Sequence, residues 1–173
     1  MRKSLGGLLW LGVGLCGTGV TPIACLPHVC TLIGCTDSEQ LSFRVPVAQV
    51  SDTNISACRN ARCWHGSIAA ADLTASMTYR WLRLAADDGS NASIECSIDI
   101  PSPADTARFT CTWEAPDSPV AAGDVLSATF TDSSGNTAFS TKGTISSFEE
   151  YYPNGEDCDD APCRAGGVEG HAE

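Results

Sequence analysis

The placement of ten cysteines behind an apolar N-terminus constrains this chain more than any other feature of its sequence. Arg2 and Lys3 precede an apolar, glycine-rich stretch over residues 5–20, which is shorter than the roughly 20 apolar residues that a membrane-spanning helix needs. A basic start, a short apolar stretch and small residues before a cysteine are typical of a cleavable export signal. We therefore expect residues 1–24 to be a signal peptide, and the later cysteines to form disulfides in an oxidising compartment.

Cys25 directly follows the expected cleavage point. The preceding Thr21-Pro22-Ile23-Ala24 resembles a bacterial lipobox, in which the cysteine is acylated and becomes the new N-terminus. Lipidation of Cys25 leaves eight cysteines, which can all pair, whereas lipidation of Cys16 would leave nine. Because several acyl chains on one cysteine give stable anchoring, we expect a membrane partner and a place in the cell envelope, at the outer membrane or cell surface. The alternative is ordinary secretion, with Cys25 in a disulfide.

The expected mature chain, residues 25–173, has the size of one domain. Removal of Arg2 and Lys3 with the leader leaves 8 basic against 21 acidic residues, a net charge of −13. So acidic a surface argues against nucleic acid or anionic lipid as a partner. The expected organisation is a signal peptide at 1–24, a lipid-anchored, cysteine-bearing segment at 25–40, a β-sandwich at 41–152 and an acidic, cysteine-stapled tail at 153–173.

The hydrophobic pattern is that of β-strands. Apolar and polar residues alternate over several short segments, namely 41–47, 94–100, 107–113 and 126–130, and residues 139–145 follow a turn at 132–136. Residues 77–85 carry bulky β-forming residues on both faces, as in a central strand, and residues 68–76 offer at most one or two helical turns. Short strands separated by turn signals predict an all-β fold: a single antiparallel, immunoglobulin-like β-sandwich of about seven strands, stapled by disulfides.

Two cysteine pairs can be assigned from spacing. If residues 92–100 and 107–115 form a hairpin, symmetric pairing places Cys96 opposite Cys111 and matches every apolar residue with an apolar one. Residues opposite in such a ladder lie close enough for a disulfide when the pair is not hydrogen-bonded. Cys58 and Cys63 lie at the two feet of a shorter hairpin by the same logic.

The remaining four cysteines pair among themselves, but spacing does not choose the pairing. We expect Cys30 and Cys35 to be tied to Cys158 and Cys163, because the acidic tail has little other apolar surface to dock it. Two local bridges, Cys30–Cys35 and Cys158–Cys163, are the alternative.

No metal or cofactor is expected. Cys58, Cys63 and His65 could be read as three ligands, but their Cys-x4-Cys spacing differs from the Cys-x2-Cys spacing of structural zinc sites. The carboxylates between Glu156 and Asp160 lack the spacing of a calcium-binding EF-hand loop.

No catalytic residues are expected either. The sequence contains no Gly-x-Ser-x-Gly elbow, no His-Glu-x-x-His motif and no glycine-rich phosphate loop. Arg80, Trp81 and Arg83 could form a stacking platform for a ligand, but we expect Trp81 to fill the core while the arginines line an outer face.

Three segments resemble a family of exported bacterial proteins, many of them lipoproteins. These are Ser56-Ala-Cys-Arg-Asn-Ala-Arg-Cys-Trp-His-Gly66, the turn Asp132-Ser-Ser-Gly135, and Tyr152-Pro-Asn-Gly-Glu-Asp-Cys158 with Cys163-Arg164. The resemblance implies an immunoglobulin-like sandwich outside the cytoplasm and no established activity, because a fold by itself does not assign function.

Two function classes follow from these expectations. The first is a non-catalytic, disulfide-stabilised envelope lipoprotein that binds a protein or glycan, or that has a structural role. The second is a secreted inhibitor of a protease or another enzyme, in which the stapled loop with Arg59, Asn60 and Arg62 enters an active site.

Overall fold

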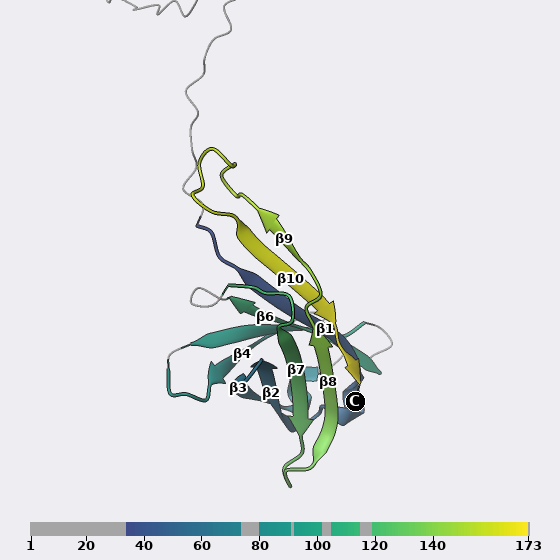
Figure 1. The fold of residues 1–173 in the computed structure, drawn as a ribbon. Coiled ribbons are helices and arrows are strands. Elements are labelled where there is room, and N and C mark those ends of the chain that lie inside the picture. Colours follow the sequence, from purple (N-terminus) through teal and green to yellow (C-terminus); the bar gives the residue numbers. More distant parts are fainter. Residues whose placement is uncertain (1–33, 74–79, 91, 102–104, 115–118, 173) are drawn as a thin grey trace, which may run out of the picture. The chain divides into compact units, whose positions relative to one another are not determined.

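The computed structural model describes residues 34–73, 80–90, 92–101, 105–114 and 119–172 (Figure 1). The expected signal peptide, the lipidation site Cys25 and Cys30 lie outside these ranges. Within them, eleven strands and two 3-10 helices are present: β1 (Ser38–Pro46), η1 (Val47–Gln49), β2 (Thr53–Arg59), β3 (Arg62–Ile68), η2 (Ala70–Leu73), β4 (Arg80–Ala86), β5 (Ser93–Asp99), β6 (Thr106–Glu114), β7 (Val125–Thr131), β8 (Thr137–Thr144), β9 (Phe148–Tyr151), β10 (Cys163–Glu169) and β11 (His171–Ala172).

The expectation of an all-β protein is confirmed, but that of a seven-stranded sandwich is wrong. The strands form one sheet in the order β11-β8-β7-β2-β3-β4-β5-β6-β1-β10-β9. Neighbouring strands within this sheet run antiparallel, except β1 and β10, which run parallel. The sheet curls into a half-barrel (Figure 1). Nearly all the buried apolar side chains of its strands form one cluster. β3 and β4 share only two residue pairs, and this short junction divides the sheet into two halves, β11-β8-β7-β2-β3 and β4-β5-β6-β1-β10-β9.

The predicted hairpin register between β5 and β6 is the observed one. Cys96 lies opposite Cys111 and Ile98 opposite Phe109, as symmetric pairing requires. The Cys96–Cys111 disulfide closes this pair, with its two Cα atoms 3.9 Å apart. Both cysteines are fully buried, because the apolar residues that alternate along these strands all face the core.

The C-terminal residues contribute two strands, β10 and β11, to the sheet. β10 lies between β1 and β9, and the Cys35–Cys163 disulfide joins its first residue to the segment before β1. Asp37 reinforces this junction, because its carboxylate accepts hydrogen bonds from the backbone N–H groups of Arg164 (2.8 Å) and Val120 (3.2 Å).

One chain segment contacts both halves of the sheet. β10 pairs with β1, and β11, one residue further on, pairs with β8 at the other end of the strand order. Gly170 lies between them and donates its N–H to the carbonyl of Ser42 at 2.7 Å. A Cβ atom at Gly170 would lie 2.5 Å from Thr141 Oγ1 and 3.0 Å from Leu41 Cδ1, so only glycine fits this approach.

Aromatic side chains from both halves of the sheet meet in the core. Phe43 stacks on Phe109 with ring centroids 5.4 Å apart, and Phe130 from the opposite half packs edge-on against both rings. Trp64 and Trp113 pack edge-to-face at 6.5 Å. Each such pair contributes about 0.5–1.5 kcal/mol beyond the burial of its apolar area.

Gly143 provides a test of the close approach between β8 and β10. A Cβ atom there would lie 2.6 and 2.7 Å from the two methyl groups of Val168. We expect Gly143→Ala to lower the free energy of unfolding by about 1–3 kcal/mol through overpacking. Gly167→Ala is the control, because a Cβ atom at that site has its nearest neighbour at 4.0 Å.

Urea unfolding of both variants measures this difference. Val168→Ala combined with Gly143→Ala is expected to recover part of the loss, since it removes the two clashing methyl groups. Equal stability of the Gly143 and Gly167 variants would contradict this account of the packing.

Candidate functional site

The stapled hairpin of β2 and β3 is the first candidate site. Cys58 and Cys63 lie directly opposite each other and form a disulfide, as their spacing predicts. Arg59 and Arg62 also pair across the two strands, so the turn consists of Asn60 and Ala61 alone. Asn60 has φ 52°, a left-handed conformation that asparagine tolerates better than most residues.

Arg59 does not belong to an exposed binding loop, and that expectation is wrong. Its side chain is only 10% exposed and lies among carboxylates that are distant in the sequence. Nε and Nη2 donate to the two carboxylate oxygens of Glu39 at 2.7 and 3.1 Å. Nη2 also lies 2.9 Å from Asp124 Oδ2 and 3.0 Å from the carbonyl of Pro119. The guanidinium is therefore committed to the fold.

Asn60 is committed in the same way, whereas Arg62 remains on the surface. Asn60 Nδ2 donates to Asp124 Oδ1 at 2.8 Å, and Asn60 Oδ1 accepts the backbone N–H of Val125 at 2.9 Å. Arg62 is 46% exposed, lies over the ring of Trp64 at 5.1 Å and forms an ion pair with Asp88 at 2.9 Å. The three residues of the expected loop thus do not form one surface.

The Glu39–Arg59–Asp124 cluster has the largest electrostatic effects among the described residues. Glu39 is fully buried on the core face of β1. Burial and the neighbouring Asp124 carboxylate raise the pKa of Glu39 to about 7, against the opposing effect of Arg59. The pKa of Asp124 is lowered far below its usual value despite partial burial, because Glu39, Asn60, Arg59 and the backbone of Ala121 hydrogen-bond to its carboxylate. The two carboxylates therefore share one cation unequally, and Glu39 is the one that gains a proton first.

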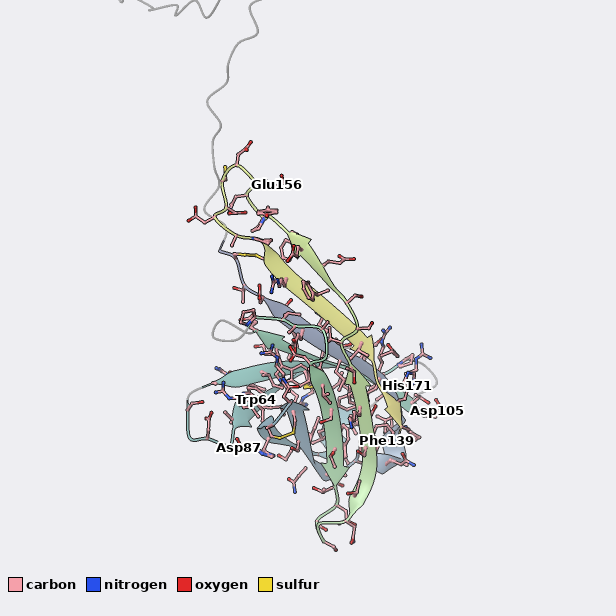
Figure 2. All side chains as sticks on the ribbon, viewed as in Figure 1. Trp64, Asp87, Asp105, Phe139, Glu156 and His171 are labelled. Atoms are coloured by element: carbon pink, nitrogen blue, oxygen red, sulfur yellow. A yellow bond between two sulfur atoms is a disulfide. The ribbon has the colours of Figure 1, made fainter. Side chains whose placement is uncertain are left out.

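This hairpin does not offer a metal site made of Cys58, Cys63 and His65. Cys58 and Cys63 are oxidised to a disulfide and have no thiolates to offer. His65 is half exposed, with Nε2 3.6 Å from Asp87 Oδ2. Glu156 lies at the tip of the loop between β9 and β10, far from Asp87 (Figure 2). Within the described ranges, no group of three or more His, Cys, Asp or Glu residues is placed to hold a metal ion.

The cysteines of the two ends are cross-linked to each other. The Cys35–Cys163 bridge has the N-terminal to C-terminal connection that we expected, and it excludes the alternative of two local bridges. Cys158 is also disulfide-bonded.

Trp81 forms the second candidate site, and its expected burial in the core is wrong. Its side chain is 57% exposed, the largest value among the large apolar side chains of the described residues. In β4 the core position is taken by Leu84, whereas Trp81 and Arg83 face outward. Trp81 borders a hollow of about 350 Å³ on the outer face of β4, β5 and β6, lined also by Ser93, Ile94, Glu95, Thr112 and Glu114.

A second hollow of about 360 Å³ lies on the same side of the sheet, beyond β6. Its lining residues come from β1, β9, β10 and the residue before β9: Ser38, Gln40, Ser147, Phe148, Glu149, Ala165, Gly166 and Gly167. In the β1–β6 register, Ser38 is paired with Glu114 and Gln40 with Thr112. The two hollows therefore adjoin along these residue pairs.

Comparison with models of protein families, with curated proteins and with solved structures finds no match in any of the three. No helix in the described part of the chain is long and apolar enough to cross a membrane.

Replacement of Arg59 tests the buried cluster. We expect Arg59→Ala to lower the free energy of unfolding at pH 8 by about 3–5 kcal/mol, because it leaves Glu39 buried without a partner. Arg62→Ala, which removes an exposed ion pair, is expected to cost less than about 1 kcal/mol. Chemical denaturation measures both, and similar losses for the two variants would show that Arg59 is not a buried structural cation.

The pH dependence of stability provides a separate test. Glu39 has an ordinary pKa of 4.5 when unfolded and about 7 when folded, so the folded state binds the proton more tightly. Its contribution to stability is full below pH 4.5 and is lost as the pH rises towards 7, with a slope of at most about 1.4 kcal/mol per pH unit. The lowered pKa of Asp124 affects stability only below its unfolded value of 3.8. It therefore adds no pH dependence between pH 4.5 and 7.

Denaturation of the wild type and Glu39→Gln between pH 5 and 7.5 measures this contribution. We expect the variant to lose the part of the slope that Glu39 supplies, while Glu95→Gln, an exposed control, keeps the wild-type slope. A Glu39→Gln slope equal to that of the wild type would rule out this assignment.

Proposed function

We propose that the chain is a non-catalytic binding module of the bacterial cell envelope, anchored to the membrane through acyl chains on Cys25. The observation that carries the extracytoplasmic part of this proposal is the oxidation state of the cysteines. All seven cysteines in the described part of the chain are disulfide-bonded. Structural disulfides persist in oxidising compartments and are rare in the cytosol.

The fold is suited to binding because a disulfide on the core side of the sheet rigidifies the strands that form its outer face. The Cys96–Cys111 disulfide joins the two strands that carry most of the first hollow, β5 and β6. A binding surface that is rigid before the ligand arrives loses less conformational entropy on association. The lipobox-like sequence before Cys25 supports attachment of this module to a membrane.

The alternative of a protease inhibitor is less well supported. A trypsin-like pocket needs an exposed basic side chain, and the side chain of Arg59 is held by Glu39 and Asp124. Arg62 is exposed, but it is paired with Asp88 and stacked on Trp64. We therefore do not assign an inhibitory role to the stapled hairpin.

Acylation of Cys25 is the direct test of the anchor. Cells that express the full chain are labelled with an alkyne-bearing fatty acid and partitioned with a phase-separating detergent. We expect the wild type to take up label and enter the detergent phase, and Cys25→Ser to lose the label and remain in the aqueous phase.

Cys16→Ser is the matched control, since it removes the cysteine inside the expected leader and should leave labelling unchanged. An intact mass with no acyl chain, or peptide mapping that finds Cys25 in a disulfide, would refute membrane anchoring and favour secretion.

A further inference from the structure

We propose that the outer face of β4, β5, β6, β1 and β10 binds an uncharged polysaccharide, with Trp81 as the ring on which a sugar stacks. This inference names a ligand class for the binding module proposed above and rests on that proposal. Four observations on the described residues carry it: the exposure of Trp81, the chemistry of the lining, the junction of the two hollows, and the rigidity of the strands beneath them.

The exposure of Trp81 is the starting point. The core holds Trp64 and Trp113 at 6% and 1% exposure, whereas Trp81 is 57% exposed on the opposite side of the sheet. Its cross-strand partner is Ser97, and Ser97 is in turn paired with Thr110, so short side chains lie on that row of the sheet. The indole is exposed and borders the hollow. An aromatic ring placed in this way can pack against the C–H face of a pyranose ring.

The polar lining fits hydroxyl groups. Thr112 carries a hydroxyl that donates and accepts, and Ser93 Oγ, which already accepts the Nε–H of Arg83 at 2.8 Å, can still donate. Glu95 and Glu114 carry carboxylates that accept. Ser38, Gln40, Ser147 and Glu149 supply the same groups in the second hollow. Sugar hydroxyls both donate and accept hydrogen bonds, so a mixture of such groups complements them better than one kind alone.

The charges disfavour one class of ligand. Among the described residues, neither lining includes a lysine, arginine or histidine, although Arg83 lies opposite Glu95 and donates its Nε–H to Ser93 Oγ at 2.8 Å beside the first hollow. Within the described residues, Glu95, Glu114 and Glu149 make no ion pair. These three carboxylates disfavour acidic polysaccharides, phosphates and nucleic acids at the two linings.

A cationic peptide is the main competitor, and the structure favours it less. The carboxylates Glu95, Glu114 and Glu149 are solvent-exposed, so ion pairs with them would be weakened by solvent and salt. Hydroxyl and amide side chains outnumber carboxylates in the two linings. The surface thus provides more groups for a polyol than for a row of positive charges.

The arrangement of the hollows suits an extended chain of sugars. Each hollow is within the range of about 300–1,000 Å³ that is typical of small-molecule sites. They meet where Glu114 and Thr112 of β6 pair with Ser38 and Gln40 of β1. Gly166 and Gly167 leave the floor of the second hollow free of long side chains. One ligand can therefore run across the strands from Trp81 towards Glu149.

Affinity electrophoresis tests the proposal on the full chain, expressed with its leader in an exporting bacterium and purified with its disulfides formed. Native gels contain hydroxyethylcellulose, galactomannan or laminarin, all of them uncharged. We expect at least one of these to retard the wild type, with an apparent Kd that is insensitive to NaCl between 0.1 and 0.5 M. Trp81→Ala should weaken this binding at least tenfold, and Glu114→Gln should weaken it about threefold or more.

Tyr151→Ala is the matched control, because Tyr151 is the other exposed large aromatic residue and lines neither hollow. It should bind as the wild type does. Thermal unfolding and disulfide mapping of each variant establish that the fold is intact, which is expected because both aromatic side chains are exposed.

Three results would overturn the proposal. These are no retardation by any of the three polysaccharides, retardation that Trp81→Ala leaves unchanged, and binding of poly-lysine alone that disappears at 0.5 M NaCl. The last result would identify a cationic ligand instead. Acylation of Cys25 is scored separately on the same preparation, so failure of the anchor and failure of the glycan site are distinguishable.

Discussion

One buried arginine links the two halves of the curled sheet, and the rest of the structure depends on that link. Arg59 belongs to β2, whereas Glu39 belongs to β1 in the other half, and Asp124 precedes β7. Removing a charged carboxylate from water is costly unless a partner of opposite charge compensates it. Above about pH 7, where Glu39 is charged, it can therefore occupy its core position only while β2 holds Arg59 beside it. This requirement fixes the two halves relative to each other more specifically than the contacts among apolar side chains, which tolerate repacking.

The strands that the sequence predicts well are those with one apolar and one polar face. The register of β5 and β6 followed from alternation alone, because a shift of one residue would turn Ile98 and both cysteines away from the core. β10 could not be found in this way. Its sequence, CRAGGVE, has two glycines and little alternation, and it joins the sheet through Cys35, Asp37 and the small volume of its glycines. Those contacts link residues more than 120 positions apart, and local pattern does not report them.

The candidate sites show the same division. The pairing of Cys58 with Cys63 is a local property and was predictable. The burial of Arg59 was not, because its acceptors lie 20 and 65 residues away. The outward position of Trp81 was missed because 77–85 carries bulky residues on both faces, so its pattern does not say which face is buried. The two faces of the sheet are nevertheless connected. The disulfide on the core side of β5 and β6 holds in place the strands that carry the hollow on the outer side.

The parallel pairing of β1 with β10 has a consequence for the order of events during biogenesis. β1 is among the first residues of the sheet to be synthesised, and β10 is among the last. The sheet therefore cannot be completed until nearly the whole polypeptide has been synthesised. Pairing between such distant segments is intrinsically slow, since loop-closure entropy is lost before the contacts form. Under the export that we propose, this delay is an advantage, because assembly on the cytoplasmic side would block the passage of the unfolded chain.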